Sequence, residues 1–477
     1  MIKRKTKIVA TLGPATDTPE RIKELIAAGV DVFRLNLSHG TRADHKRRID
    51  TVRDVSAGFM RQVAILMDIQ GPKIRIGKVQ EGGVLLKEGS VITITNEDMI
   101  GNEEVVPTTY RGLPEDLSAG DRVLIDDGLL ELKVDSVSGS EVRCIVVYGG
   151  LLKDHKGINL PGVDVSAPAF TEKDRGDVDF GVGEEVDFFA LSFVRTVGDI
   201  KQLRDYLEGR GSRTPILSKI ETDTAIKNLD GIVTNSDGVM VARGDLGVEL
   251  SAEDVPILQK QIIEMARKAG KPVITATQML DSMMVSPRPT RAEASDVANA
   301  VFDGTDAVML SGETASGKYP VKSVEMMGRI IDKAEGVVVK KQEFIRRNME
   351  TRSSVTEAVA FAALAAAGEI SAKAIVVFTL SGSTAYLISR LRPKATIICF
   401  TPSEVTGKKL ALYWGLSSFF IQFGSVGDEL ISQGESRLLE LGLVKKGDHI
   451  VMVSGSSSGI SGATNMMRIT TCSGLTA

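Results

Sequence analysis

Two acidic residues, Glu221 and Asp245, each end a short apolar run and have the chemistry of a metal site. They close P-I-L-S-K-I-E (215–221) and G-V-M-V-A-R-G-D (238–245). Mg2+ is held by one or two carboxylates and keeps its other positions for water and substrate oxygens. Either residue alone could instead begin a helix, where carboxylates are favoured. Because both follow neighbouring runs, we favour a site for Mg2+ or Mn2+.

Lys219 lies two residues before Glu221, so on a strand both side chains point to the same face. A fixed ammonium beside a metal ion stabilises negative charge on a transferring phosphoryl group or on an enolate. Schiff-base formation is the alternative use of such a lysine. The neighbouring carboxylates favour charge stabilisation.

Residues that could bind phosphate and cations follow two other apolar runs. They are Arg34, Asn36, Ser38 and His39 in 32–40, and Asp68 and Arg75 at and beyond 64–71. Two arginines, an amide and a hydroxyl around a carboxylate suit a phosphate bound together with cations. Each residue taken singly is more often an ordinary polar residue, so their joint placement carries the inference.

Hydroxyl groups near two later run ends could relay a proton through water. Thr275 and Thr277 close one run, and Ser311 and Glu313 close the next. Threonine is also a common strand residue. A purely structural role therefore stays open, more so for Thr275 than for Thr277.

Eight apolar runs of this kind predict the elements that position these residues. A buried parallel strand is continuously apolar rather than alternating, and most of the runs recur at the roughly 25–35-residue spacing of a βα unit. Eight such units form a (β/α)8 barrel, whose active site lies where the strands end. The runs are 7–14, 32–40, 64–71, 186–194, 215–221, 238–245, 272–279 and 307–314.

One interval, between Gly71 and Val186, is longer than a βα unit by roughly 90 residues, enough for a small inserted domain. Strand-like runs with glycine turns at 84–95, 121–134 and 141–148 predict a small all-β barrel, placed to act as a lid. Beyond a polar linker at 346–354, an alanine-rich helix and four apolar runs predict a C-terminal α/β domain with a mainly parallel sheet.

We therefore expect a (β/α)8 TIM barrel with an inserted all-β lid and a C-terminal α/β regulatory domain. The predicted boundaries are 1–70 and 167–340 for the catalytic barrel, 71–166 for the lid, and 341–477 for the C-terminal domain.

The C-terminal domain contains a candidate phosphate loop. A strand passes into a helix through F-T-L-S-G-S-T (378–384), and small residues at a helix N-terminus expose backbone N–H groups to an anion. The Gly/Ser-rich stretch 454–464 could close over it. Two solvent-exposed turns are the alternative, and the effector is not identified. The loop residues are Thr379, Ser381, Gly382, Ser383 and Thr384.

Composition excludes several classes of protein. A net charge of −4 without a basic tract gives no reason to expect nucleic-acid binding. No run approaches 18 apolar residues, so no membrane span is expected. Three widely spaced cysteines give no disulfide framework and favour the cytoplasm. The G-x-x-x-x-G-K match at 312–318 lacks the Ser or Thr of a P-loop, because Tyr319 follows.

Several motifs make the sequence resemble the pyruvate kinase family over essentially its full length. The most specific is I-T-A-T-Q-M-L-D-S-M-M-V-S-P-R-P-T-R-A-E-A-S-D-V-A-N-A-V-F-D-G-T-D-A-V-M-L-S-G-E-T-A, with support from R-L-N-L-S-H-G, S-K-I-E, M-V-A-R-G-D-L-G-V-E and K-G-I-N-L-P-G. The resemblance implies phosphoryl transfer from phosphoenolpyruvate to ADP, giving pyruvate and ATP, the last step of glycolysis. It also implies a homotetramer, whereas the expectation of a phosphorylated small-molecule effector comes from the candidate phosphate loop.

The resemblance also implies individual roles. Glu221 and Asp245 hold the divalent metal, Lys219 stabilises the phosphoryl group and the enolate, and Arg34 bridges phosphates. The phosphoenolpyruvate carboxylate is seated by the backbone around Ala242, Arg243 and Gly244, together with Thr277, which lies near the proton-transfer path. The residues implied to meet the nucleotide phosphates and a second metal are Asn36, His39, Arg75 and Lys156.

Lys73 is a departure from the potassium-dependent members of that family. Those members resemble this chain around Asn36, Ser38 and Asp68, but they carry Glu where Lys73 stands in G-P-K-I-R. An ammonium built into that place could replace the monovalent cation, so we expect activity without added K+. Gln70 is a second departure, because Lys is common at this place in the family, and the sequence does not explain it.

Two other functional classes remain as alternatives. A metal-dependent carbon–carbon lyase could use the same enolate chemistry on a keto acid, although it would need no nucleotide lid. A catalytically idle, ligand-sensing scaffold would be expected to have lost Lys219 or the two carboxylates, and all three are present.

Overall fold

Eight parallel strands, almost entirely buried, form the centre of the fold. The computed structural model describes residues 4–341, 354–423, 428–455 and 464–473. In the order β1-β16-β15-β14-β13-β12-β3-β2 the strands close into a barrel, which confirms the prediction from the eight apolar runs. The strands are β1 (Lys7–Thr11), β2 (Val32–Asn36), β3 (Ala64–Ile69), β12 (Phe188–Leu191), β13 (Ile216–Ile220), β14 (Gly238–Ala242), β15 (Val273–Ala276) and β16 (Ala307–Leu310).

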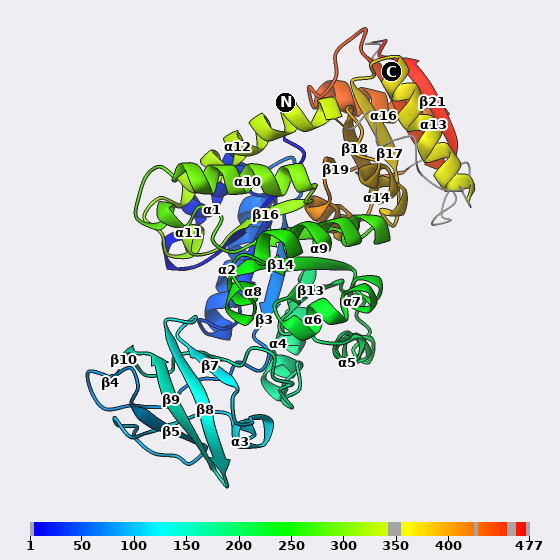
Figure 1. The fold of residues 1–477 in the computed structure, drawn as a ribbon. Coiled ribbons are helices and arrows are strands. Elements are labelled where there is room, and N and C mark those ends of the chain that lie inside the picture. The colour runs from blue at the N-terminus through cyan, green and yellow to red at the C-terminus, as the bar shows by residue number, and fades with distance from the viewer. Residues whose placement is uncertain (1–3, 342–353, 424–427, 456–463, 474–477) are drawn as a thin grey trace. The chain divides into compact units, whose positions relative to one another are not determined.

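Helices follow the barrel strands along the chain (Figure 1). Local sequence sets their ends. For example, the Thr290 hydroxyl accepts a hydrogen bond from the Glu293 backbone N–H at one helix start, and Gly304 ends that helix in the left-handed region. The longer helices are α1 (Pro19–Ala28), α2 (Arg42–Ala57), α4 (Glu172–Gly183), α5 (Val197–Glu208), α9 (Val255–Ala269), α10 (Arg291–Asp303) and α12 (Pro320–Lys341). Shorter ones are η1 (Pro14–Thr16), α6 (Asp223–Lys227), α7 (Leu229–Asn235), α8 (Arg243–Glu249), η2 (Asp281–Met284) and α11 (Gly312–Ala315).

The chain divides into two compact units. The first unit consists of Met1–Met67, Glu184–Phe188 and Pro272–Ala477, and the second unit of Asp68–Gly183 and Phe189–Lys271. The predicted boundaries of the barrel, lid and C-terminal domain stay a prediction. Within the described ranges, no helix is both long enough and apolar enough to cross a membrane.

The insertion, in the second unit, is an all-β domain with one short helix. It has a six-stranded sheet, β11-β7-β8-β9-β5-β6, and a two-stranded sheet, β10-β4. The segment around Ile76 joins both edges of the larger sheet by single bridges, Arg75 to Gly157 and Ile76 to Thr108. The elements are β4 (Val84–Leu86), β5 (Val91–Thr95), β6 (Val105–Pro107), α3 (Leu113–Asp116), β7 (Arg122–Ile125), β8 (Leu130–Ser138), β9 (Glu141–Tyr148), β10 (Gly150–Leu152) and β11 (Ile158–Asn159).

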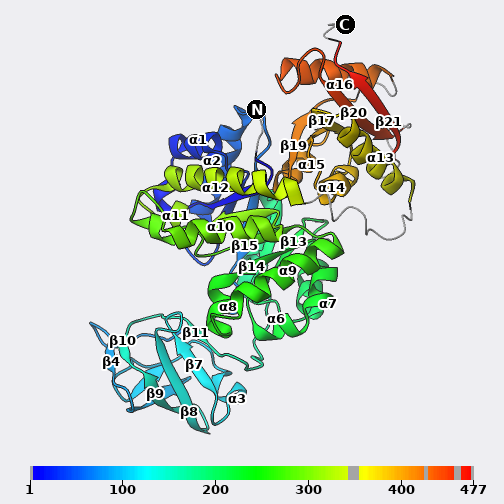
Figure 2. The ribbon, with the colours of Figure 1, turned by 45° about the horizontal axis from the view of Figure 1, so that its top comes forward.

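The C-terminal domain, in the first unit, has the sheet β19-β18-β17-β20-β21, in which only β21 runs antiparallel. Helices α13 and α14 cover one face of the sheet and α16 covers the other (Figure 2). The mainly parallel sheet is as predicted, but β21 was missed because its exposed side chains make no apolar run. The elements are α13 (Val355–Glu369), β17 (Ala374–Phe378), α14 (Ser383–Arg390), β18 (Thr396–Thr401), α15 (Glu404–Lys409), η4 (Leu410–Leu412), β19 (Leu416–Phe420), α16 (Asp428–Glu440), β20 (His449–Gly455) and β21 (Thr464–Thr471).

Charged side chains join this domain to the barrel strands of the first unit. The Arg392 guanidinium lies 2.6 Å from the Asp306 carboxylate, directly before β16. The Lys5 ammonium, before β1, donates to the Pro393 carbonyl at 2.6 Å. Lys5 and Arg392 also lie over the Trp414 ring, at 5.1 and 4.6 Å from its centroid. The starts of two barrel strands are thus bonded to the loop that precedes β18.

Gly149→Ala should destabilise the insertion. A Cβ at this position would lie 2.4 Å from the Leu86 carbonyl oxygen, and backbone cannot yield as a side chain does. We expect the free energy of unfolding to fall by about 1–3 kcal/mol, measured by urea unfolding. Gly183→Ala is the control, because nothing lies within 4 Å of its added Cβ. Equal stability of the two variants would contradict the expectation.

Candidate active site

The Lys219 ammonium is the centre of a buried polar cluster in the second unit. It lies 2.7 Å from a Glu221 carboxylate oxygen and 3.4 Å from an Asp68 oxygen. It also donates to the Ser192 hydroxyl at 2.7 Å. Glu221 and Asp68 are 1 % and 2 % exposed. The shared strand face of Lys219 and Glu221 is therefore confirmed, and Asp68 joins them from the end of β3.

Ser192 is a member of this cluster that the sequence did not single out. Its hydroxyl donates to the Ile69 carbonyl at 2.8 Å and lies 3.3 Å from Asp68. In the sequence, Ser192 is distinguished only by being the last polar residue of the run 186–194. The hydroxyl thus links the ends of β3 and β12 to the ammonium on β13.

The next residue, Phe193, has a positive φ of 53° and donates its backbone N–H to Glu221 at 2.7 Å. A left-handed bulky residue is uncommon and is retained where its surroundings require it. Gly71 lies beside it, where an added Cβ would be 3.0 Å from the Phe193 ring. The strained backbone fixes one oxygen of Glu221, and the Lys219 ammonium holds the other.

Burial raises the pKa of Glu221 from its ordinary 4.5 to about 7, with Lys219 opposing the shift and the Asp245 charge adding to it. Asp245 lies half-buried in the first turn of α8, directly after β14. The charge of Asp245 therefore acts on Glu221 in the same direction as burial.

Glu221 and Asp245 fit a hard divalent cation. Their oxygens are the ligands that Mg2+ prefers, and two carboxylates leave positions for water and substrate. In the part of the chain that the structure describes, no group of three or more His, Cys, Asp or Glu residues could hold a metal ion. A metal here would therefore take its remaining ligands from substrate and water.

Arg243, which follows β14, turns its guanidinium to the Gln259 side-chain oxygen on α9 at 3.2 Å. Together with Ala242 and Gly244 it forms the turn from β14 into α8. The side chain of Arg243 is thus engaged with α9, which leaves the expected carboxylate contact to the backbone of this turn.

Two predicted nucleotide residues lie on adjacent segments of the insertion. Arg75 donates to the His155 carbonyl at 2.9 Å and pairs with Gly157 across a single bridge. The neighbouring Lys156 forms an ion pair with Asp126 at 2.8 Å. The structure therefore brings Arg75 and the Lys156 segment together.

A small cavity of about 70 Å3 lies in the second unit, with Lys73, Asp127, Asn159, Asp245 and Glu249 among the residues that line it. It thus joins residues of the insertion to the candidate metal ligand. Lys73 is exposed, and its Cε would lie 3.7 Å from a Cβ added at Gly157. Gln70, at the end of β3, is half-buried, and nothing in the structure explains its choice.

Glu249 and Asn159 were not anticipated from the sequence. The Asn159 amide donates to the Glu249 carboxylate at 3.4 Å, which connects the insertion to α8. Burial raises the pKa of Glu249 to about 7, and the charges of Asp245 and Asp223 act in the same direction. No sequence signal pairs two residues that lie this far apart in the chain.

Arg34 and its neighbours lie in the first unit, at the end of β2. The buried Arg34 guanidinium donates to the Thr11 hydroxyl at 3.1 Å. Asn36 accepts a hydrogen bond from the Ser38 backbone N–H, also at 3.1 Å. His39 is exposed, and Gly40 after it is left-handed, with φ of 83°. Asn36, Ser38 and His39 therefore form one short turn.

Thr277 and Gln278 follow β15 in the first unit and have positive φ values of 67° and 52°. Two consecutive left-handed non-glycine residues mark a functional candidate. Thr275 is fully buried and donates to the Thr305 hydroxyl at 3.0 Å, as a structural residue would.

Ser311 and Glu313 follow β16. Glu313 accepts from the backbone N–H groups of Leu280 and Ser311 at 3.0 and 2.7 Å. This buried carboxylate thus ties two strand-end loops together, and burial raises its pKa. Its role here is structural.

The candidate phosphate loop leads from β17 into α14. Gly382 is left-handed and donates its N–H to the Thr379 hydroxyl at 2.9 Å. Ser381 and Ser383 are exposed and 3.1 Å apart at their hydroxyls. Thr384 contacts Thr464 at 2.6 Å. Most of the stretch predicted to close over this loop, residues 456–463, lies outside the described residues, as do 346–353 of the predicted linker.

Comparisons with known proteins cover almost the whole chain. A family model for the pyruvate kinase barrel domain matches residues 3–324, and one for the pyruvate kinase alpha/beta domain matches 357–470. A pyruvate kinase of Geobacillus stearothermophilus is 44% identical over 100% of this chain and 82% of its own length. A pyruvate kinase of Clostridium acetobutylicum is 44% identical over 98% of this chain and 99% of its own length. A pyruvate kinase of Staphylococcus saprophyticus is 46% identical over 98% of this chain and 80% of its own length.

Mg2+ affinity should increase with pH. The metal requires ionised Glu221, whose pKa is raised to about 7, so protons compete with the metal below that pH. We expect affinity to rise about tenfold from about pH 6 to about pH 8, measured by calorimetry. Without metal, the free energy of unfolding depends on pH in the opposite direction. The folded state disfavours ionised Glu221, so the free energy of unfolding falls as the pH rises from 4.5 towards 7.

Glu249→Gln is the control for this experiment, because Glu249 has a similar pKa and is not an expected ligand. The variant should keep the rise in affinity. An affinity that stays constant over this pH range, or a rise that disappears in Glu249→Gln, would contradict the assignment to Glu221.

Proposed function

The chain belongs to the pyruvate kinase family and is a phosphotransferase of that family, and we propose that the cluster around Lys219 carries its reaction. The reaction is transfer of the phosphoryl group of phosphoenolpyruvate to ADP; the enolate left behind takes up a proton to give pyruvate. The single observation that supports this assignment is the buried ammonium held between Glu221, Asp68 and Ser192.

Lys219 offers positive charge where negative charge develops. Phosphoryl transfer depends on positioning and charge stabilisation more than on covalent participation of the protein. An ammonium fixed by three oxygen partners needs little rearrangement as the phosphoryl group leaves the enolate oxygen. A divalent cation held by Glu221 and Asp245 would supply further positive charge at the oxygens of phosphoenolpyruvate.

Other residues of the barrel position the substrates in this proposal. Arg34 bridges the phosphates through its bidentate guanidinium. The backbone around Ala242, Arg243 and Gly244 seats the carboxylate together with Thr277. Thr277 also orients the water that delivers the proton to the methylene carbon. This use of strand ends follows from the barrel topology, in which catalytic groups come from the ends of several strands.

The insertion supplies the nucleotide contacts in this proposal. Arg75 and Lys156 bind the nucleotide phosphates, together with Asn36 and His39. Lys156 is paired with Asp126 at 2.8 Å, so nucleotide binding exchanges that carboxylate for a phosphate. Closure of the insertion as a lid would exclude water during transfer.

The alternative function, a carbon–carbon lyase, is not favoured. A lyase would use the metal and Lys219, but Arg75 and Lys156 would then have no function in the reaction. The relatives carry the name pyruvate kinase over almost the full length of this chain.

Assembly, regulation and location complete the proposal. The half-exposed side chains of Phe302 and Val337, on α10 and α12, border an apolar surface that a homotetramer would cover. The exposed hydroxyls of Ser381 and Ser383, with the Gly382 turn, support a phosphorylated effector at that loop. Three buried free cysteines are consistent with the cytoplasm.

Lys219→Ala should lower kcat for pyruvate formation by about 100-fold or more, because the charge on the transferring group loses its fixed partner. The measurement is a coupled assay with phosphoenolpyruvate, ADP and Mg2+. Lys201→Ala, at an exposed position on α5, is the control and should keep wild-type turnover. Near wild-type activity of Lys219→Ala would refute the role of Lys219.

Wild-type activity should not require K+, because the Lys73 ammonium takes the place of the cation near Asn36, Ser38 and Asp68. The measurement compares turnover in K+- and NH4+-free buffer before and after addition of KCl. Lys73→Glu should introduce activation by K+, whereas the exposed control Lys78→Glu should not. A many-fold activation of the wild type by KCl would refute the proposal.

A further inference from the structure

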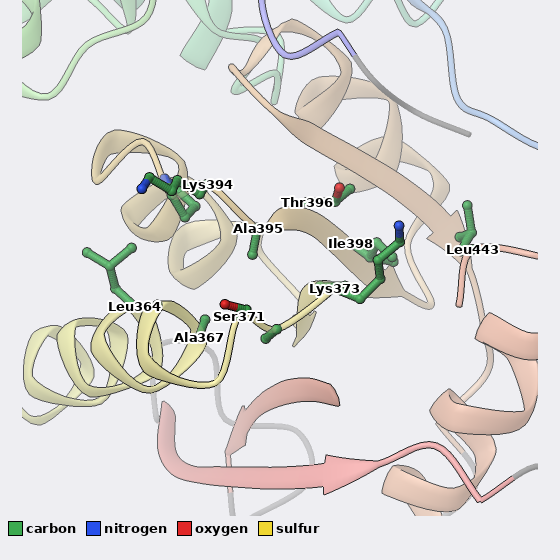
Figure 3. A pocket seen from close by; sticks show the side chains of 13 residues that line it. Leu364, Ala367, Ser371, Lys373, Lys394, Ala395, Thr396, Ile398 and Leu443 are labelled. Carbon is green, nitrogen blue, oxygen red and sulfur yellow. The ribbon is translucent and has the colours of Figure 1, made fainter. Parts of the chain in front are cut away.

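A cavity of about 440 Å3 lies in the C-terminal domain, and Figure 3 shows the residues that line it. It opens at the amino-terminal edge of the sheet, where β17 and β18 begin at Ala374 and Thr396. The candidate phosphate loop leaves β17 at its other end, after Phe378. The two places are therefore distinct, and a volume of this size suits a small-molecule ligand.

The cavity has apolar walls from both sides of the sheet. Leu364 and Ala367 of α13 belong to the core on one face, and Ile398 belongs to the core on the other face. Leu443, in the loop before β20, packs against the same core as Ile398. These walls fit the aliphatic body of a ligand.

Lys373 and Lys394 are the charged residues that line the cavity, and no acidic residue lines it within the described ranges. Their side chains lie on opposite sides of the cavity in Figure 3. Lysines placed apart around an apolar space favour a ligand with two separated negative groups. Hydroxyls of Ser371 and Thr396 add polar contacts between them.

Two loops at this edge contain the left-handed non-glycine residues Ser371 and Arg392, with φ of 49° and 50°. Each follows the end of a helix, where glycine would avoid the steric cost of a Cβ. Arg392 is ion-paired with Asp306, directly before β16. Ser371 has no such bond to the barrel among the described contacts, and its hydroxyl lines the cavity.

The loop that carries Lys394 is the one bonded to the barrel strands of the first unit. Lys5 donates to the carbonyls of Pro393 and Lys394 at 2.6 and 2.7 Å. Asp306, the partner of Arg392, also accepts from the Val273 backbone N–H at 2.9 Å, at the start of β15. A ligand that moves this loop acts on the strand that leads to Thr277.

We propose that this cavity binds a small organic dianion, with two carboxylate or phosphate groups separated by an aliphatic body, and that binding is transmitted to β15 through the loop 392–395. The ligand's acidic groups pair with Lys373 and Lys394, and its body lies against the apolar walls. This site is additional to the effector loop and goes beyond the proposed reaction.

Calorimetry of the full-length protein with the α,ω-dicarboxylates succinate, adipate and suberate tests the binding site. We expect one chain length to bind best, and hexanoate, with a single carboxylate, to bind about tenfold more weakly than adipate. Lys373→Met and Lys394→Met should each weaken the best dicarboxylate about tenfold. Lys446→Met, at an exposed lysine that does not line the cavity, should leave binding unchanged.

Ala395→Trp, which fills the cavity while keeping both lysines, should abolish binding; each variant's thermal midpoint shows that it is folded. The proposed site is refuted if no dicarboxylate binds, if Ala395→Trp binds normally, or if Lys446→Met weakens binding as much as Lys373→Met. Because calorimetry needs no turnover, this result is independent of the proposed reaction.

Enzyme kinetics tests the transmission. The best dicarboxylate should change the KM for phosphoenolpyruvate in the wild type, whereas Arg392→Lys should bind it and lose that change. An unchanged KM in the wild type, or an effect fully retained in Arg392→Lys, refutes transmission through this loop.

Discussion

A lysine ammonium buried between two carboxylates is the constraint on which the site depends. Charges in a protein interior are costly unless they are paired and hydrogen-bonded, and Lys219 meets this condition through Glu221, Asp68 and Ser192. The Asp245 charge adds to the effect of burial on Glu221, and Lys219 opposes it. The same burial raises the pKa of Glu221 to about 7.

The connections of the insertion start beside this cluster. Gly71, two residues after the end of β3, donates its N–H to the Asp174 carboxylate at 3.1 Å. On the returning connection, Arg195 donates to the carbonyls of Val165 and Ala167. Arg195 lies three residues after Ser192. The two connections of the insertion are therefore hydrogen-bonded close to the residues that hold Lys219.

The predictable part of the molecule is the part that local pattern determines. Continuous apolar runs predicted the barrel strands, and a spacing of two residues predicted the Lys219–Glu221 pair that the structure confirms at 2.7 Å. Ser192 and the Asn159–Glu249 contact were missed, because they depend on packing between distant segments. β21 was missed because an exposed antiparallel strand has no apolar run. The left-handed conformation of Thr277 cannot be inferred from its residue type, since threonine normally avoids it.

Trp414 is the only tryptophan in the chain, and it is 6 % exposed beneath the Lys5 and Arg392 cations. Indole emission responds to charges and water near the ring, and no second indole contributes a background. The protein therefore contains a built-in fluorophore at the junction between its C-terminal domain and the barrel strands of the first unit. Rearrangement at that junction can be followed optically in the unlabelled wild-type protein, during turnover or ligand titration.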